Sequence, residues 1–139
     1  MTIEPAGPAD GGEVARLLGQ LSPGREPPSP AELAEILAAA GTELLLARDG
    51  GRVAGMLTLV LFRTPTGLHG RIEDVVVDEP ARGRGIGAAL TEEALRRAAA
   101  AGVDAVELTS RPSREPANRL YARLGFERRE TNVYVWRPG

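Results

Sequence analysis

The chain has 139 residues, of which 42% are hydrophobic and 26% are charged. This composition is typical of a soluble globular domain and argues against a disordered or fibrous protein. The formal net charge of -2 lacks the basic surplus that a general nucleic-acid binder needs over phosphate. No apolar run approaches the roughly 18 residues of a membrane-spanning helix, and the start shows no secretory signal. We therefore expect a cytoplasmic protein with neither nucleic acid nor membrane as a partner.

Missing residue types exclude several kinds of chemistry. The chain has no Cys, which rules out disulfides, thiolate zinc sites and cysteine nucleophiles. All 17 basic residues are Arg, so Schiff-base catalysis and the phosphate-binding Lys of a Walker A loop are excluded too. His69 is the only histidine, and one imidazole cannot form a paired-histidine zinc site. We expect no metal.

The first part of the chain carries the signals of a short extended start and two helices. Apolar residues at i, i+3, i+4 and i+7 predict the first helix, with Asp10 at its N-cap. This stripe consists of Val14, Leu17, Leu18 and Leu21. Four prolines and a glycine make residues 22–30 a loop. The second helix repeats the stripe, begins with a capping box of Ser29 and Glu32, and ends at Gly41.

Strand signals follow. Residues 42–48 and 52–62 are expected to form a hairpin around the turn Asp49-Gly50-Gly51. Residues 63–70 are polar and turn-rich, and we expect a loop there. Residues 71–78 form a β-branched strand, whose central valines indicate burial on both faces.

A glycine-rich turn, Arg82-Gly83-Arg84-Gly85-Ile86-Gly87, leads from this strand into a long Ala-rich helix. The chain then continues with a strand over residues 104–110, a last helix that ends at Gly125, and an extended segment over residues 126–136. The order β-α-α-β-β-β-α-β-α-β predicts one mixed α/β domain over residues 1–139.

The glycine-rich turn has a physical use at a strand–helix junction. The first N–H groups of a helix lack partners and lie at the positive end of its dipole, while glycines let them approach an anion closely. Together with Arg82 and Arg84 this favours a phosphate or diphosphate site over a tight turn with solvated arginines. Gly83-x-Gly85-x-x-Ala88 with Asp104 also fits a dinucleotide-binding fingerprint. The glycine-rich turn of that fingerprint follows the first strand of a βαβ series, whereas here two helices and a hairpin come before it.

Two motifs resemble those of the GNAT N-acetyltransferases. Val75-Val76-Val77-Asp78 followed by Arg82-x-x-Gly85-x-Gly87 is similar to the family's acetyl-CoA motif, Arg/Gln-x-x-Gly-x-Gly/Ala. Asn118 and Tyr121 resemble its second motif, and the element order agrees over nearly the whole chain. The resemblance implies an α/β fold with a central, mostly antiparallel sheet, a splayed parallel strand pair and about four flanking helices.

The resemblance also implies how acetyl-CoA would bind. Its pantetheine arm would lie like an extra strand between the Val75–Val77 strand and the strand over residues 104–110, with its diphosphate on the amides of the glycine-rich turn. The implied cofactor-binding residues are Val75, Val76, Val77, Arg82, Gly83, Arg84, Gly85, Ile86, Gly87, Asn118 and Tyr121.

The implied reaction is direct transfer of acetyl to a primary amine of a small molecule. Tyr121, which lies i, i+3 from Asn118 on one helix, is the expected general acid for the departing thiolate. Glu73 is the expected base, acting through water, since strand alternation places it with Val75 and Val77 unless a bulge intervenes. Alternatively, Asp74 is the base, or the amine arrives already neutral and no residue acts as a base.

The remaining expectations concern the acceptor and the partners. We expect the acceptor pocket to include Arg63, Thr66, His69 and Glu73, and a homodimer is a family expectation. Tyr134 and Trp136 are expected to close the chain's own sheet, with packing against a second subunit as the alternative. The competing hypothesis is a non-catalytic acyl-CoA-binding or regulatory module on the same fold.

Overall fold

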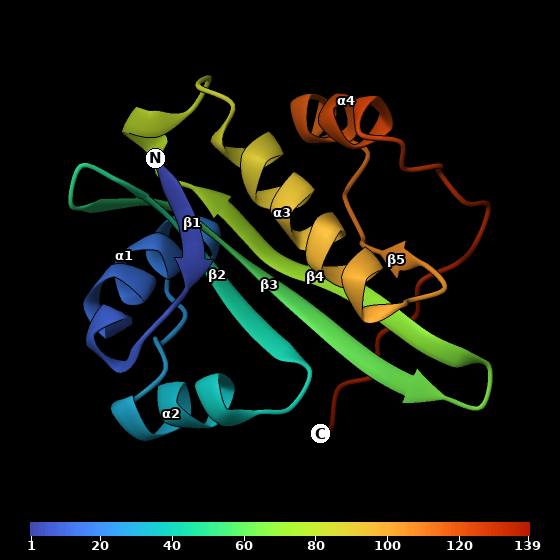
Figure 1. Ribbon diagram of the computed structural model, residues 1–139, viewed down its shortest axis with the longest axis horizontal. Helices are drawn as coiled ribbons and strands as arrows, with labels where there is room; N and C mark the ends of the chain where they lie inside the picture. Colours follow the sequence, from blue (N-terminus) through green and yellow to red (C-terminus); the bar gives the residue numbers. More distant parts are fainter. The chain divides into compact units, whose positions relative to one another are not determined.

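The computed structural model describes residues 1–139, which divide into two compact units, Met1–Thr109 and Ser110–Gly139. The first unit holds the sheet and three of the α-helices (Figure 1). Its elements are β1 (Thr2–Pro5), α1 (Gly11–Leu21), α2 (Pro30–Ala38), β2 (Thr42–Asp49), β3 (Arg52–Thr64), β4 (Gly67–Val77), α3 (Ile86–Ala101) and β5 (Val106–Glu107). The second unit holds α4 (Glu115–Arg123). None of the helices has the length and apolar character needed to cross a membrane.

The sheet has five strands in the order β1-β2-β3-β4-β5. Strands β1 to β4 pair antiparallel, whereas β4 and β5 run parallel. The parallel pair arises because the chain crosses over through α3 before it returns as β5. The predicted mixed sheet, mostly antiparallel with a parallel pair at one edge, is confirmed.

Helices α1 and α2 cover one face of the sheet. Leu46 of β2 and Met56 of β3 lie opposite each other and share a buried cluster with Val14 and Leu17 of α1 and Leu33 of α2. Because side chains alternate along a strand, the neighbouring positions point to the other face. Each face of the sheet therefore has its own apolar layer.

Helix α3 lies across β3 and β4 on the opposite face (Figure 1). Gly55 permits the close approach, since a Cβ there would lie 3.0 Å from Leu90 Cδ1 and 3.2 Å from Ile86 Cγ2. Leu45 and Leu57, which pair across β2 and β3, are fully buried. This packing fixes the start of α3 relative to the end of β4.

Short-range sequence signals are confirmed at α2 and at the first hairpin. Ser29 Oγ accepts a hydrogen bond from the Glu32 N–H at 3.1 Å, and the Glu32 carboxylate accepts one from the Ser29 N–H at 2.9 Å. This is the predicted capping box. In the turn between β2 and β3, Gly50 and Gly51 have φ values of 60° and 86°, which glycine adopts without steric cost.

Asp10 precedes α1 but does not cap it with its side chain. Its carboxylate instead accepts a hydrogen bond from the Gly7 N–H at 2.7 Å and pairs with Arg48 of β2 at 2.8 Å. The hydrogen bond from Arg48 is the main reason why the pKa of Asp10 is lowered. A residue with good capping chemistry is thus used to attach the helix start to the sheet.

The prediction of a loop over residues 63–70 is wrong. Strand β3 runs to Thr64 and β4 begins at Gly67, with these two residues paired, so a two-residue turn joins the strands. His69 Nε2 lies 2.9 Å from both Thr64 Oγ1 and Thr66 Oγ1, which secures the end of the hairpin. The polar composition that indicates a loop is equally compatible with paired strands that project from the core.

One predicted strand is shorter than expected and another is absent. Residues 104–110 form only the short strand β5, Val106–Glu107. Residues 126–136 form no strand, and the side chains expected to close the sheet are exposed, Tyr134 at 87% and Trp136 at 84%. The continuous apolar run Val133–Trp136 has no strand partner, so β-propensity alone does not make a strand there.

Candidate functional site

One edge of β4 lacks a neighbouring strand over much of its length. β5 pairs with β4 only at Gly70 and Arg71, opposite Val106 and Glu107. The rest of β4, Ile72–Val77, continues past the end of β5. Backbone groups on such a strand edge can hydrogen-bond an extended ligand. The two strands are therefore not paired along their full length, and the expected slot for a pantetheine arm fits this geometry.

The strand leads through a single 3-10 turn, Glu79–Ala81, into the glycine-rich turn. Gly83 and Gly85 have φ values of 80° and 78°, in the left-handed region that favours glycine. A Cβ at either position would meet no atom within 4 Å, so glycine is needed for conformation and the turn stays open. No side chain caps α3, and its first turn has no acidic residue. Its first N–H groups can therefore receive an anion.

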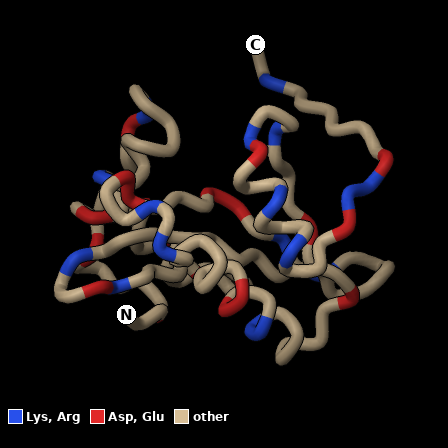
Figure 2. Tube along the Cα trace, turned by 90° about the horizontal axis from the view of Figure 1, so that it is seen from above, with Lys and Arg blue, Asp and Glu red and all other residues tan.

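The two arginines of the turn already have partners. Arg82 Nε donates to the Val77 carbonyl at 3.2 Å, at the end of β4. Arg84 pairs with Asp49, at the end of β2, at 2.9 Å. Basic and acidic positions are interspersed along the trace of the first unit rather than gathered on one side (Figure 2). Both arginines are thus engaged by protein groups, whereas the main-chain N–H groups at the start of α3 are the part of the turn left open to an anion.

Asp78, between β4 and the turn, is buried, which strand patterning did not indicate. Its carboxylate accepts a hydrogen bond from Gln20 at 2.8 Å and pairs with Arg16 at 2.9 Å and with Arg52 at 3.1 Å. Gln20 also accepts a hydrogen bond from the Glu79 N–H at 2.9 Å. The hydrogen bond from Gln20, followed by those from the arginines, lowers the pKa of Asp78. These contacts hold the entrance of the turn against α1 and β3.

A β-bulge interrupts β4 in front of this turn. Thr58 of β3 pairs with Glu73, but Met56 pairs with Val76, so β4 has one more residue than β3 between these pairs. The bulge includes Asp74, whose φ of 52° is the only positive value outside glycine. Simple alternation therefore fails here, and Glu73 lies on the same face as Val76 and Met56 instead of with Val75 and Val77.

The two acids at the bulge have different surroundings. Glu73 accepts a hydrogen bond from Arg71 Nε on the same strand. Asp74 is in none of the hydrogen bonds or ion pairs of the structure. Its pKa is raised by burial and then by the charge of Glu73, while Arg25 acts in the opposite direction. Asp74 is therefore the acid with an uncommitted carboxylate.

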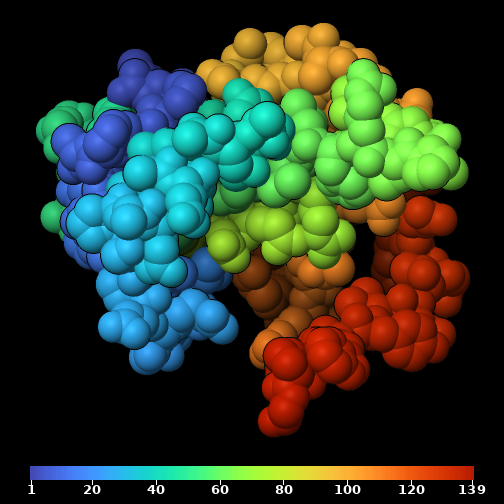
Figure 3. Space-filling model, turned by 90° about the horizontal axis from the view of Figure 1, so that it is seen from below, coloured from blue at the N-terminus to red at the C-terminus, as the bar shows by residue number.

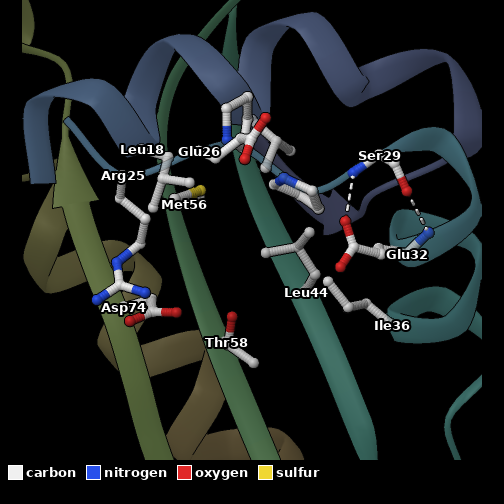
Figure 4. Close-up of a pocket in the computed structure, with 13 residues that line it drawn as sticks. Leu18, Arg25, Glu26, Ser29, Glu32, Ile36, Leu44, Met56, Thr58 and Asp74 are labelled. Carbon is white, nitrogen blue, oxygen red and sulfur yellow. Dashed lines mark hydrogen bonds between the residues drawn. The ribbon is translucent and has the colours of Figure 1, made fainter. Parts of the chain in front are cut away.

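A pocket of about 530 Å³ lies beside the bulge, on the face covered by α1 and α2. It is lined by α1, the loop segment 25–29, the start of α2 and residues of β2, β3 and β4. In the close-up, the side chains of Arg25 and Asp74 extend toward each other at one end of the pocket (Figure 4). The light-blue chain before α2 and the yellow-green β4 both reach the surface on this side (Figure 3).

The pocket does not contain the residues expected of it. None of Arg63, Thr66, His69 and Glu73 lines it. The first three belong to the hairpin formed by β3 and β4, and the carboxylate of Glu73 is hydrogen-bonded to Arg71. Sequence reasoning missed Arg25 and the prolines beside it, which come from a segment that reads only as a loop. Asp74 was the alternative acid at the strand, and the bulge is what directs it to the pocket.

Tyr121 and Asn118 lie on α4 in the second unit. The Tyr121 ring is half-buried and packs edge-on against Phe126, with ring centroids 5.7 Å apart. Burial raises the pKa of Tyr121, so its hydroxyl keeps its proton at neutral pH. Asn118 Nδ2 donates to the Arg111 carbonyl at 3.0 Å and thereby ties α4 to the preceding loop.

Comparison with known proteins identifies the family. The model of the acetyltransferase (GNAT) family matches residues 14–126, which is most of the chain. The chain belongs to the GNAT acetyltransferase family. The dinucleotide alternative is thereby set aside, in agreement with a turn that follows the fourth strand of a mainly antiparallel sheet.

Individual proteins are similar to this chain in sequence or in structure. A mycothiol acetyltransferase from Beutenbergia cavernae is 40% identical over 83 residues, which are 60% of this chain and 28% of that relative. A solved structure from Agrobacterium tumefaciens str. C58 has a TM-score of 0.90 and 25% identity, covering 99% of this chain and 100% of the other. A transcriptional regulator from Bacillus halodurans C-125 has a TM-score of 0.85 and 29% identity, covering 97% and 98%.

Proposed function

We propose that this chain transfers the acetyl group of acetyl-CoA directly to a primary amine of a small molecule. The observation that carries the proposal is the free edge of β4 over Ile72–Val77, which runs into an open glycine-rich turn at the start of α3. A strand edge followed by unpartnered helix N–H groups suits an extended chain that ends in a diphosphate. A homodimer remains a prediction.

Acetyl-CoA supplies the activated acetyl thioester, and the residues present fit it. The N–H groups of Gly83 to Gly87 would bind the diphosphate, assisted by Arg82. Backbone groups of Val75, Val76 and Val77 would bind the pantetheine arm as a strand binds its neighbour. Asp78 supports this role, since its ion pairs hold the strand end and the turn in a fixed relation.

Two side chains would move the protons. Tyr121, protonated at neutral pH, would donate its proton to the departing sulfur. Of the two acids at the bulge we favour Asp74 over Glu73 as the acceptor of the amine proton, because Glu73 is bound to Arg71 whereas Asp74 faces the pocket. A raised pKa suits Asp74 to this task, since a base with a pKa nearer to neutrality accepts a proton more readily.

The substitution Tyr121→Phe tests the catalytic part of the proposal. We expect acetyl-CoA affinity, measured by calorimetry, to stay unchanged while turnover, measured by thiol release, falls by at least about 100-fold. Tyr134→Phe is the matched control, because Tyr134 is 87% exposed in the C-terminal segment. Unchanged turnover in Tyr121→Phe would remove this residue from the mechanism.

The double variant Arg82→Ala, Gly85→Ala tests the binding part. An Ala at position 85 would be strained at a φ of 78°, which should disturb the N–H groups of the turn. We expect weaker acetyl-CoA binding, and equal affinity would show that the turn is not the diphosphate site.

A regulatory role is the second candidate, favoured by the 29% identity to a transcriptional regulator. Under this alternative the chain binds an acyl-CoA but does not turn it over, and Tyr121 is structural. Acetyl-CoA binding without acetylation of any amine in a broad panel would favour the regulatory role.

A further inference from the structure

The pocket beside the bulge has mainly apolar walls. Its apolar lining comes from Val14 and Leu18 of α1, Leu44 and Met56 of the sheet, and Pro27-Pro28 before α2. A volume of about 530 Å³ is in the range of small-molecule sites. A ligand rich in hydroxyl groups would lose hydrogen bonds to water against these walls without replacing them.

Few polar groups of the pocket are free to bind a ligand. Ser29 and Glu32 line the pocket, but they already bond to each other in the capping box (Figure 4). Thr58 presents a hydroxyl, and Asp74 presents a carboxylate that takes part in no hydrogen bond or ion pair. The Glu26 carboxylate is likewise unpaired, but this exposed residue belongs to the loop before α2. Thr58 and Asp74 both come from the strands at the bulge, so a ligand held by them would have its polar end toward β4.

The charges of the pocket favour a cationic ligand. Three carboxylates, those of Glu26, Glu32 and Asp74, line it together with a single cation, Arg25. Arg25 lies next to Asp74, so its charge is partly balanced (Figure 4). A ligand with a phosphate or carboxylate group would meet net negative charge, whereas an ammonium group would be attracted.

We propose that the acceptor is a primary amine with a compact apolar body and no anionic group. Its ammonium group lies beside Asp74, and its hydrocarbon body packs against Leu44 and Met56. This inference rests on the proposed function and names its substrate class. Each transfer forms one C–N bond and breaks one C–S bond, and the proton lost by the amine nitrogen balances the one gained by sulfur. The extra proton of the ammonium form passes to Asp74 and on to water.

A matched panel of amines tests the class. 3-Methylbutylamine and leucine differ only in the carboxylate, and glucosamine supplies a larger, hydroxyl-rich body. We expect kcat/KM with acetyl-CoA to be at least about tenfold higher for 3-methylbutylamine than for either of the others. A mismatched charge, or several hydroxyls left without hydrogen bonds, costs more free energy than a tenfold difference in kcat/KM corresponds to. A preference for leucine or glucosamine overturns the proposal.

Two variants assign the preference to named residues. Asn tolerates a positive φ, so the variant Asp74→Asn should keep the bulge. In this variant we expect KM for 3-methylbutylamine to rise about tenfold, while the affinity for acetyl-CoA stays unchanged. Arg25→Gln, which removes the single cation, should lower that KM or leave it unchanged. If Arg25→Gln instead abolishes turnover of a preferred leucine substrate, the pocket holds a zwitterion and the proposal is wrong.

Binding measurements separate this inference from the proposed function. If no amine is acetylated but 3-methylbutylamine still binds in an Asp74-dependent manner by NMR titration, transfer fails and the ligand class stands. If some other amine is acetylated while 3-methylbutylamine neither binds nor reacts, transfer stands and the ligand class fails.

Discussion

The substitution Asp78→Asn tests whether one buried carboxylate holds the entrance of the glycine-rich turn. Asp78 is the only charged side chain among the buried residues. Asn has nearly the same size and can still hydrogen-bond Gln20, but it cannot form ion pairs with Arg16 and Arg52. The variant therefore removes charge while it keeps the packing.

The structure sets the size of the effect. Removing one partner of a buried ion pair costs about 3–5 kcal/mol when the other charge stays buried. Here the Arg16 and Arg52 side chains are 28% and 60% exposed, so water replaces part of the lost interaction. We expect a loss of about 2–3 kcal/mol in the free energy of unfolding. For a chain of this length that lowers Tm by roughly 10 °C.

The effect should depend on pH in a defined direction. Because the pKa of Asp78 is lowered in the folded state, its contribution is fully present above the unfolded value of about 3.9. The contribution is lost as the pH falls through the folded pKa. The stability difference between the wild-type protein and Asp78→Asn should thus be largest at neutral pH and shrink below about pH 4.

Urea unfolding followed by circular dichroism at pH 7 and pH 3 measures both quantities. Asp49→Asn is the control, because the Asp49–Arg84 pair is exposed and should contribute no more than about 1 kcal/mol. If Asp78→Asn is as stable as Asp49→Asn at pH 7, the buried network does not stabilise the fold and the reasoning fails.

Two further predictions concern local structure. Ser29→Ala removes the N-cap of α2 and should reduce the free energy of unfolding by about 1 kcal/mol in urea titrations; no loss would mean that the cap is compensated by water. Gly41→Ala should cost at least about 3 kcal/mol, since its φ is 82° and a Cβ there would lie 2.3 Å from the Leu61 carbonyl oxygen. Gly50→Ala, with a φ of 60° and open space, should cost only about 1–2 kcal/mol. Equal midpoints for the two glycine variants would contradict the steric argument.

The sequence by itself determined the features that depend on neighbouring residues. The capping box of Ser29 and Glu32 forms within one helical turn, so its residues specify it wherever the helix packs. The turn at Gly50-Gly51 and the left-handed conformations of Gly83 and Gly85 follow in the same way, because only glycine adopts them at low cost. The family motifs lie in segments of this kind, whose conformation depends on neighbouring residues, so they can be recognised in the sequence alone.

The tertiary structure decided the features that depend on residues far apart in the chain. The hairpin over residues 63–70 needs a paired strand, and the bulge at Asp74 appears only in the register between β3 and β4. Asp78 is buried because α1 and β3 bring Gln20, Arg16 and Arg52 to it. The pocket likewise exists only where the loop before α2 meets the sheet. Pairing register and burial are set by contacts across the whole fold, and no local window of the sequence contains them.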